Sequence, residues 1–172
     1  MAEFQQYLDR LSADPGDGQA LAALESVASQ NGVNALTAEV GSELARVRKS
    51  LLARGELDLV GKLLDLELAA LASKETESGR RADLLLEKGE LHADSLLEPE
   101  PAMDCYRQAL ELRPDDEGAT ESLAQLEMER DNWEKFVKTF VDQAEGATDR
   151  QLSTHMYWSA ARLCAHYQPA PG

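Results

Sequence analysis

Cysteine, basic residues and long apolar runs are all scarce in this sequence. Its 172 residues include 2 cysteines. Cys105 and Cys164 lie in apolar stretches of helical periodicity and form no C-x-x-C motif, so we expect two buried thiols rather than a disulfide or a metal site. No apolar run approaches the ~18 residues of a membrane-spanning helix, and no apolar signal-peptide core follows the N-terminus. These absences favour a soluble, cytoplasmic chain with no membrane contact.

Basic residues are outnumbered by acidic ones, 17 to 32, which gives a formal net charge of −15 at pH 7. Proteins that bind nucleic acid through its phosphates need the opposite sign, so we expect no nucleic-acid partner. A basic partner, or solubility alone, fits this charge. The basic cluster Arg46, Arg48 and Lys49, with Arg54 beyond it, either pairs with nearby glutamates or forms a site for an acidic segment of a partner.

The residue patterns of enzymes and metal sites are also missing. Gly55–Lys62 is similar to a phosphate-binding loop, but five residues instead of four separate its glycines, and Leu63 stands where Ser or Thr would bind magnesium. Cys164 and His166 are two positions apart, so on a helix they point in different directions and cannot bind one zinc ion. No Ser/His/Asp or Cys/His set has suggestive spacing, and no carboxylate pair stands out. We expect no enzymatic activity, no cofactor and no metal.

Apolar residues recur at the 3.6-residue period of a helix along almost the whole chain, and nothing alternates at the period of a strand. The pattern predicts an all-α fold. Proline and glycine mark turns at Asp14–Gly16, Arg54–Glu56 and Glu98–Pro101. The expected helices cover about 4–13, 17–31, 57–73, 84–97, 99–114, 116–130, 132–145 and 149–166. The stretch 34–54 fits either one helix or two helices broken at Gly41–Ser42.

Two pairs of segments are similar to each other within the chain. Tyr7–Asp17 matches Tyr106–Asp116, 99 positions later, and in both an apolar stripe with a tyrosine leads to a proline and an aspartate. Arg54–Leu57 matches Arg130–Trp133, 76 positions later. An interval of 99 residues is about three units of a ~34-residue helix-turn-helix repeat. Such repeats bury their core between neighbours and leave a long concave surface.

The segment from Leu85 to Pro114 resembles the tetratricopeptide repeat. In its first helix Gly89 takes the place of the small residue and His92 that of the aromatic residue. The places of the second helix are filled by Ala102, Tyr106, Ala109 and Pro114. The segment departs from the consensus at Lys88, where leucine is usual, and in a loop before Ala102 that is about one residue longer.

This resemblance implies one domain over 1–172, built as a right-handed superhelical stack of eight or nine helices in antiparallel pairs. The best-matching repeats are 82–115 and 116–147. In this family small residues let paired helices approach closely and aromatic residues fill the gaps. The positions expected in the core are therefore Ala102, Tyr106, Ala109, Leu123, Ala124 and Phe136.

The resemblance also implies a scaffold or adaptor that binds a peptide or partner protein in the concave groove. The groove positions carried over from the family are Glu87, Glu90, Asp94, Glu121, Gln125, Glu129, Trp158 and Arg162. Their carboxylates favour a basic or amide-rich partner, with Trp158 as an aromatic anchor. The alternative is a regulatory or accessory helical-repeat domain of a larger enzyme, secretion or motility machine.

The last expected helix, 149–166, has no following partner, which favours a fragment of a longer protein. It carries more apolar surface than one preceding hairpin covers, including Tyr157, Leu163 and Tyr167. An uncovered apolar patch is typical of a contact site. We therefore expect this helix to meet a second copy of the chain or a helix supplied by the longer protein.

Overall fold

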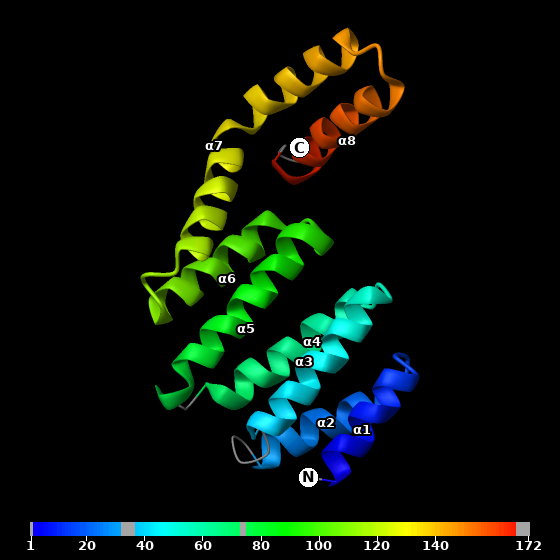
Figure 1. Cartoon of the computed structure of the whole chain (residues 1–172), viewed down its shortest axis with the longest axis vertical. Coiled ribbons are helices and arrows are strands. Elements are labelled where there is room, and N and C mark those ends of the chain that lie inside the picture. Colours follow the sequence, from blue (N-terminus) through cyan, green and yellow to red (C-terminus); the bar gives the residue numbers. More distant parts are fainter. Residues whose placement is uncertain (1, 32–36, 73–74, 168–172) are drawn as a thin grey trace, which may run out of the picture.

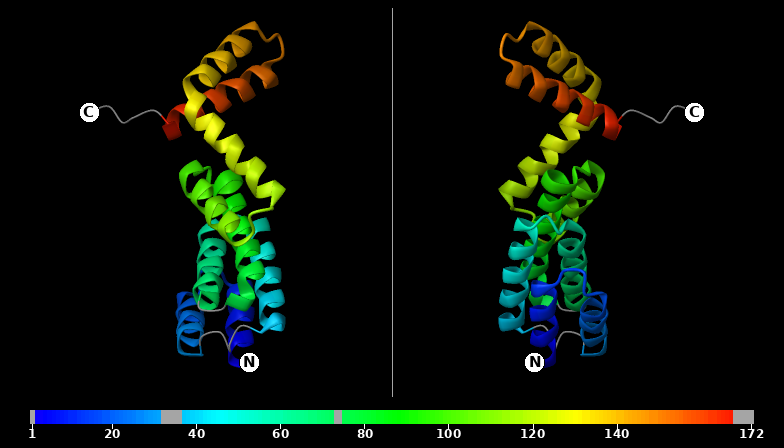
Figure 2. Two further views of the ribbon diagram at one scale, coloured as in Figure 1. Left: turned by 90° about the vertical axis from the view of Figure 1, so that its left-hand side faces the viewer. Right: turned by 90° about the vertical axis from the view of Figure 1, so that its right-hand side faces the viewer.

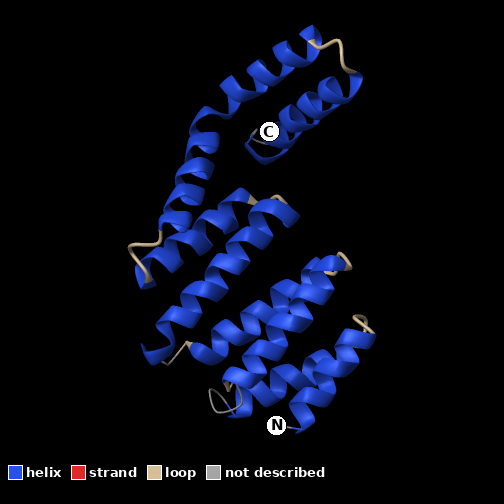
Figure 3. Ribbon diagram, viewed as in Figure 1, coloured by secondary structure: helices blue, strands red, loops and turns tan. Residues whose placement is uncertain are grey.

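Helices make up the computed structural model of this chain, and they pack against one another along its length (Figures 1 and 3). The structure describes residues 2–31, 37–72 and 75–167, and within these ranges there is no strand. The predicted all-α class is confirmed for this part of the chain.

The described residues form eight α-helices, and most of their bounds lie within a few residues of the prediction. The helices are α1 (Ala2–Ala13), α2 (Gly18–Asn31), α3 (Ala38–Ala53), α4 (Leu57–Leu71), α5 (Ser78–Glu90), α6 (Pro99–Leu112), α7 (Glu117–Gly146) and α8 (Arg150–Tyr167). Helix α5 begins and ends earlier than the helix expected at 84–97, and α7 spans two expected helices. A short 3₁₀ turn, η2 (Glu75–Glu77), precedes α5, and a π-helical turn, η3 (Leu91–Leu96), follows it. For the stretch 34–54 the sequence allowed one helix or two. The structure has one, because α3 runs unbroken through Gly41–Ser42. Residues 34–36 lie outside the described ranges.

Neighbouring helices pack in pairs, α1 with α2, α3 with α4, α5 with α6 and α7 with α8. Successive pairs meet mainly through α1 and α3, α2 and α4, α4 and α5, and α6 and α7. The molecule is therefore elongated, with the N-terminus at one end and the α7–α8 hairpin at the other (Figure 2).

The two matched segments 99 positions apart end in the same helix cap. Asp17 Oδ1 accepts a hydrogen bond from Ala20 N at 2.9 Å, and Asp116 Oδ1 accepts one from Ala119 N at 2.9 Å. An aspartate at this position satisfies a backbone donor that the first turn of a helix leaves free. The internal similarity thus corresponds to a shared local geometry at the starts of α2 and α7.

The core is continuous from α1 to α5 and is built mainly of leucine, with fully buried side chains that include Leu8, Leu24, Leu44 and Leu63. A second, smaller cluster joins α6 to α7. Of the expected core positions, Ala102, Tyr106 and Ala109 are buried as predicted. Leu123 and Phe136 are partly buried, and the prediction for Ala124 was wrong, since it is exposed. Its place is taken by Ala119, which lies in the cluster with Tyr106.

The expected turn at Asp131–Asn132 is a kink and not a reversal of the chain. The helices predicted for 116–130 and 132–145 run on as the single helix α7, with a non-helical backbone at Asn132 (φ −125°, ψ 15°). The side chain of Asn132 donates a hydrogen bond to Met128 O at 3.0 Å. The expected unit 116–147 is therefore one bent helix, and α8 folds back along its second half (Figure 1).

The π-helical turn lies where the sequence is about one residue longer than the tetratricopeptide consensus. A π turn adds one residue within a helix, so η3 takes up this extra length before α6 begins. Leu97 closes the turn in the left-handed region (φ 58°), and Glu98 N donates to His92 O at 2.7 Å. His92 itself is partly buried, with Nδ1 2.8 Å from Glu98 Oε2. It is thus a polar partner of the turn, although a packing role was expected.

Candidate functional site

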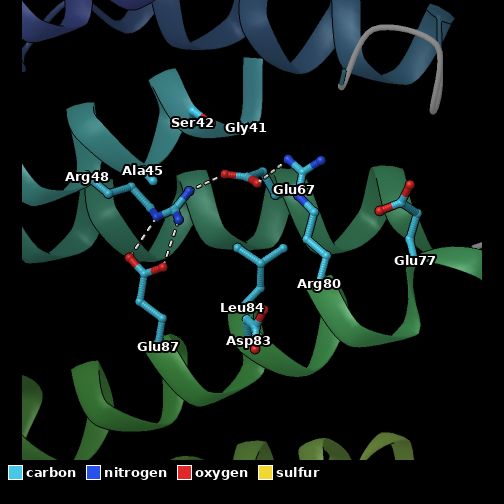
Figure 4. Close-up of a pocket in the computed structure, with 10 residues that line it drawn as sticks. All are labelled: Gly41, Ser42, Ala45, Arg48, Glu67, Glu77, Arg80, Asp83, Leu84 and Glu87. Atoms are coloured by element: carbon cyan, nitrogen blue, oxygen red, sulfur yellow. Dashed lines mark hydrogen bonds and ion pairs between the residues drawn. The ribbon is translucent and has the colours of Figure 1, made fainter. Parts of the chain in front are cut away.

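Two concave places each contain two or more of the residues that the sequence analysis singled out for the groove or the basic cluster. The first is an open cleft of about 430 Å³ between α3, α4 and α5 (Figure 4). Its lining residues are Gly41, Ser42, Ala45, Arg48, Glu67, Glu77, Arg80, Asp83, Leu84 and Glu87. The second is a smaller pocket at the bend of α7.

Arg48 is the central group of the cleft. Only 3% of its side chain is exposed. It binds Glu87 with two hydrogen bonds, of 2.8 Å from Nε and 2.7 Å from Nη2, and it also forms an ion pair with Glu67. A planar guanidinium suits this paired recognition of a carboxylate. Arg48 therefore joins α3 to both α4 and α5.

Glu67 lies between two guanidinium groups at the base of the cleft. Its side chain is 1% exposed, and its second oxygen pairs with Arg80 Nη2 at 2.9 Å. Burial raises the pKa of the Glu67 carboxyl, although the charges of Arg48 and Arg80 act in the opposite direction. Burial also disfavours the charged form of Arg48, yet its pKa lies above the ordinary value because Glu87 and Glu67 stabilise the cation. With two guanidinium groups in contact, we take Glu67 to be ionised at neutral pH.

The close approach of Arg80 depends on a glycine in α3. A Cβ atom at Gly41 would overlap the Arg80 guanidinium. Gly41 was considered as a helix break in the sequence, but its role in the structure is to leave room for this side chain. The cleft is thus built around the buried pair Arg48 and Glu67, and with the partly exposed Glu87 and Arg80 these charges neutralise one another and hold three helices together.

The structure does not bring the basic cluster of α3 together on one surface. Arg48 is buried, whereas Arg46 is exposed and paired with Glu43, and Lys49 is exposed. The ion-pair alternative therefore describes Arg46 and Arg48. Sequence reasoning missed Glu67. A signal was nevertheless present: Glu67 lies on the apolar stripe of α4, at four-residue spacing between Leu63 and Leu71.

The second concave place is a pocket of about 180 Å³ on the inner side of the α7 bend, here called the elbow pocket. Both halves of α7 and the facing side of α8 form its wall. It is lined by Gln125, Met128, Glu129, Phe136, Phe140, Ser159, Arg162 and Leu163. Three of the expected groove residues, Gln125, Glu129 and Arg162, therefore meet at one site.

The polar groups of the elbow pocket are only loosely paired. Arg162 Nη2 lies 3.8 Å from Glu129 Oε2, and Gln125 donates to Glu129 at 3.3 Å. Arg162 Nε is buried and has no hydrogen-bond partner within the part of the chain that the structure describes. A buried donor without a partner costs about 1–3 kcal/mol. The pocket thus combines an apolar floor with polar groups that are weakly paired with one another.

The other expected groove residues lie elsewhere. Glu87 belongs to the Arg48 cleft, and Trp158 points away from the elbow pocket, with 53% of its surface exposed. Glu90, Asp94 and Glu121 are exposed. Glu121 follows the same helix face as Gln125 and Glu129, at four-residue spacing. The carried-over set is therefore divided between the Arg48 cleft, the elbow pocket, the outer face of α8 and exposed positions of α5, η3 and α7.

The described residues contain neither a group of metal-ligating side chains nor a membrane-spanning helix. Across 2–31, 37–72 and 75–167 no three His, Cys, Asp or Glu side chains are grouped so as to hold a metal ion. No helix in those ranges is long and apolar enough to cross a membrane.

Comparison of the chain with protein-family models, curated proteins and solved structures found no match. The resemblance to the tetratricopeptide repeat accordingly depends on the residues quoted above.

Proposed function

We propose that this chain is a protein-interaction scaffold that holds a basic segment of a partner against the inner side of the α7 bend. The observation that carries the proposal is the elbow pocket, in which three expected groove residues meet an apolar floor. The tetratricopeptide-like sequence of 85–114 adds the stacked-helix context in which such surfaces bind proteins.

The size of the elbow pocket favours a protein ligand over a small molecule. Sites for small molecules usually enclose about 300–1,000 Å³. The elbow pocket has about 180 Å³, which suits one large apolar side chain. Phe136, Phe140 and Leu163 offer that side chain a mainly apolar wall. Anchors of this kind contribute most of the energy of many protein interfaces.

The charge around the elbow pocket defines the rest of the ligand. Glu121 and Glu129 lie on one face of α7, and the chain as a whole carries −15. A lysine or arginine next to the anchoring side chain would pair with these carboxylates. The ligand is therefore a peptide segment with a large apolar residue flanked by basic residues, and its binding weakens as salt rises because exposed charges are screened over ~8 Å at physiological ionic strength.

Selection from a random peptide library tests this function directly. The wild-type chain should enrich peptides that combine lysine or arginine with one large apolar residue. The double variant Glu121→Lys/Glu129→Lys should lose this enrichment. The matched control is Glu3→Lys/Glu25→Lys, which makes the same charge change at exposed positions of α1 and α2. Enriched peptides without basic residues, or equal enrichment by both double variants, would contradict the proposal.

A further inference from the structure

The C-terminal helix α8 has two unlike stripes along its length. One stripe faces α7 and is buried or partly buried; it consists of Ser153, Met156, Ala160, Leu163 and Tyr167. The other is fully exposed and consists of Gln151, Thr154, Trp158, Ala161 and Ala165. Both follow the alternating spacing of three and four residues by which one helix packs on another. The exposed stripe, here called the outer stripe, thus has the pattern of a packing surface without a partner among the residues that the structure describes.

Trp158 is the largest side chain of the outer stripe and lies at its centre. It is 53% exposed and stacks on His155, with ring centroids 6.5 Å apart. Tyr157 and Leu152, on the same helix, are 46% and 47% exposed. Three large exposed apolar side chains on one helix are typical of a contact site.

The charge of α8 distinguishes it from every other helix that the structure describes. Its sequence from Arg150 to Tyr167 contains no Asp or Glu, whereas α1 to α7 each contain at least one. Two copies of a chain with a net charge of −15 repel each other. Their carboxylates would meet on most surfaces, since like charges in contact are destabilising. The outer stripe is the helical surface on which two copies can pack without opposing carboxylates.

We propose that the outer stripe is an interface between two copies of this chain, which pair through α8 in antiparallel orientation about a twofold axis near Trp158. Trp158 lies at the middle of Arg150–Tyr167, so an antiparallel pair brings the two tryptophans together. The small residues Thr154 and Ala161 then face each other across the interface and let the helices approach closely. An interface of this kind uses the same patch on both copies.

The same pairing accommodates the charges of α8. Arg150 of one copy lies at the level of His166 of the second copy, and Arg162 faces the elbow pocket instead of the interface, so no arginine opposes another. The antiparallel helix dipoles also place each positive end beside a negative end. A single helix pair covers less than the ~1,200–2,000 Å² of a stable interface, so we expect dissociation constants of order 10 µM or weaker.

Sedimentation of the whole chain across protein concentration tests the association. Dimers should appear at tens of micromolar and increase with salt, because salt screens the repulsion of two acidic chains. Salt should have the opposite effect on the binding of the proposed peptide ligand, which weakens as salt rises. The dimer and the peptide site can therefore be disproved separately. Trp158→Glu should weaken the dimer by more than about tenfold. Ala22→Glu, which adds the same charge at an exposed position of α2, should leave it unchanged. A chain that is monomeric throughout, or a dimer insensitive to Trp158→Glu, would overturn the proposal.

Disulfide trapping tests the orientation and leaves Trp158 in place. In a background of Cys105→Ala and Cys164→Ala, the double variant Thr154→Cys/Ala161→Cys should form covalent dimers, because each new cysteine faces the other type across the axis. Within one helix these positions are ~10.5 Å apart, too far for an internal bond. Thr154→Cys alone is the control, since its two copies stand ~12 Å apart along the axis. Equal trapping of the control, or no trapping of the double variant, would exclude this antiparallel interface.

Discussion

The ring of Tyr106 in α6 lies directly against Gly89 in α5. A Cβ atom at position 89 would stand 2.7 Å from Tyr106 Cε1 and 3.0 Å from two further ring atoms. Tyr106 is 4% exposed and packs with Ala102 and Ala119, so it has little room to move. The glycine therefore sets the distance between the two helices of the segment that resembles a tetratricopeptide repeat.

Gly89→Ala should destabilise the chain although alanine is the better helix former. Alanine gains about 0.8–1 kcal/mol of helix propensity over glycine, whereas overpacking of a core costs about 1–3 kcal/mol. The difference between these two ranges is a net loss of up to about 2 kcal/mol, which we expect in urea unfolding. The control is Gly61→Ala in α4, where the new Cβ would stand 3.8 Å from Leu91 Cδ2, an ordinary contact. That variant should be neutral or stabilised; a stabilised Gly89→Ala would disprove the close approach.

Arg48→Met should be among the most damaging single changes to a charged residue. It leaves the buried carboxylate of Glu67 with Arg80 as its remaining cation, and breaking a buried pair in this way costs about 3–5 kcal/mol. The double variant Arg48→Met/Glu67→Leu should lose less than the two single losses together, because no buried charge then lacks its partner. Arg46→Met, in the same helix but with an exposed pair, should change the unfolding free energy much less. Equal losses for Arg46→Met and Arg48→Met would show that the buried network adds nothing.

The cap of α7 should give a pH-dependent stability. The pKa of Asp116 lies below its ordinary value because Ala119 N donates to the carboxylate and Arg113 pairs with it. A depressed folded-state pKa means that the stabilisation is present above the unfolded pKa of about 3.9 and is lost as the pH falls through the folded value. Asp116→Asn keeps a capping oxygen but does not titrate. The variant should therefore unfold more easily than wild type at pH 7, and the difference should shrink below pH ~4.

The neighbouring substitution Asp115→Asn provides the control for this measurement, because Asp115 is exposed and Asp116 is the residue that caps α7. At pH 7 its unfolding free energy should stay close to that of wild type, because Asp115 does not cap the helix. A constant difference for Asp116→Asn would mean that the charge of the cap does not stabilise the helix.

The two cysteines should differ in reactivity. Cys105 is buried, and burial raises the pKa of its thiol, which lowers the thiolate fraction that alkylating reagents need. Cys164 is partly exposed, so the expectation of two buried thiols holds for Cys105 alone. Iodoacetamide at pH 8, followed by mass spectrometry, should label Cys105 more than about tenfold more slowly than Cys164. Denaturant should remove the difference; equal rates in the native chain would place Cys105 at the surface.

The sequence predicted the helices well because their ends carry strong local signals. Gly55 adopts φ 78°, a conformation that favours glycine, and the chain reverses there between α3 and α4. The matching position 131 has aspartate, and α7 continues past Asn132 with only a kink. The two segments look alike in apolar spacing, yet one glycine decides between a turn and a bend. Apolar periodicity alone contains no information about that choice.

The sites were harder to predict than the helices because they depend on residues far apart in the chain. Glu67 and Arg48 meet across two helices, and neither residue indicates the other in the sequence. The elbow pocket was partly foreseen through Gln125, Glu129 and Arg162, which the family resemblance assigned to a groove. Trp158 was assigned to the same groove, but it follows the opposite stripe of α8. The direction of a side chain on a terminal helix depends on which neighbour the helix packs against.

The kink at Asn132 makes the end of the molecule a lever arm. Beyond it, 14 residues of α7 extend to Gly146, and α8 packs chiefly against them. At 1.5 Å per residue this arm is ~21 Å long, so a rotation of about 10° at one pair of backbone torsions displaces its tip by about 4 Å. The elbow pocket has walls on both sides of that pivot. A ligand wedged there would therefore set the angle of the arm, and with it the direction in which Trp158 is presented.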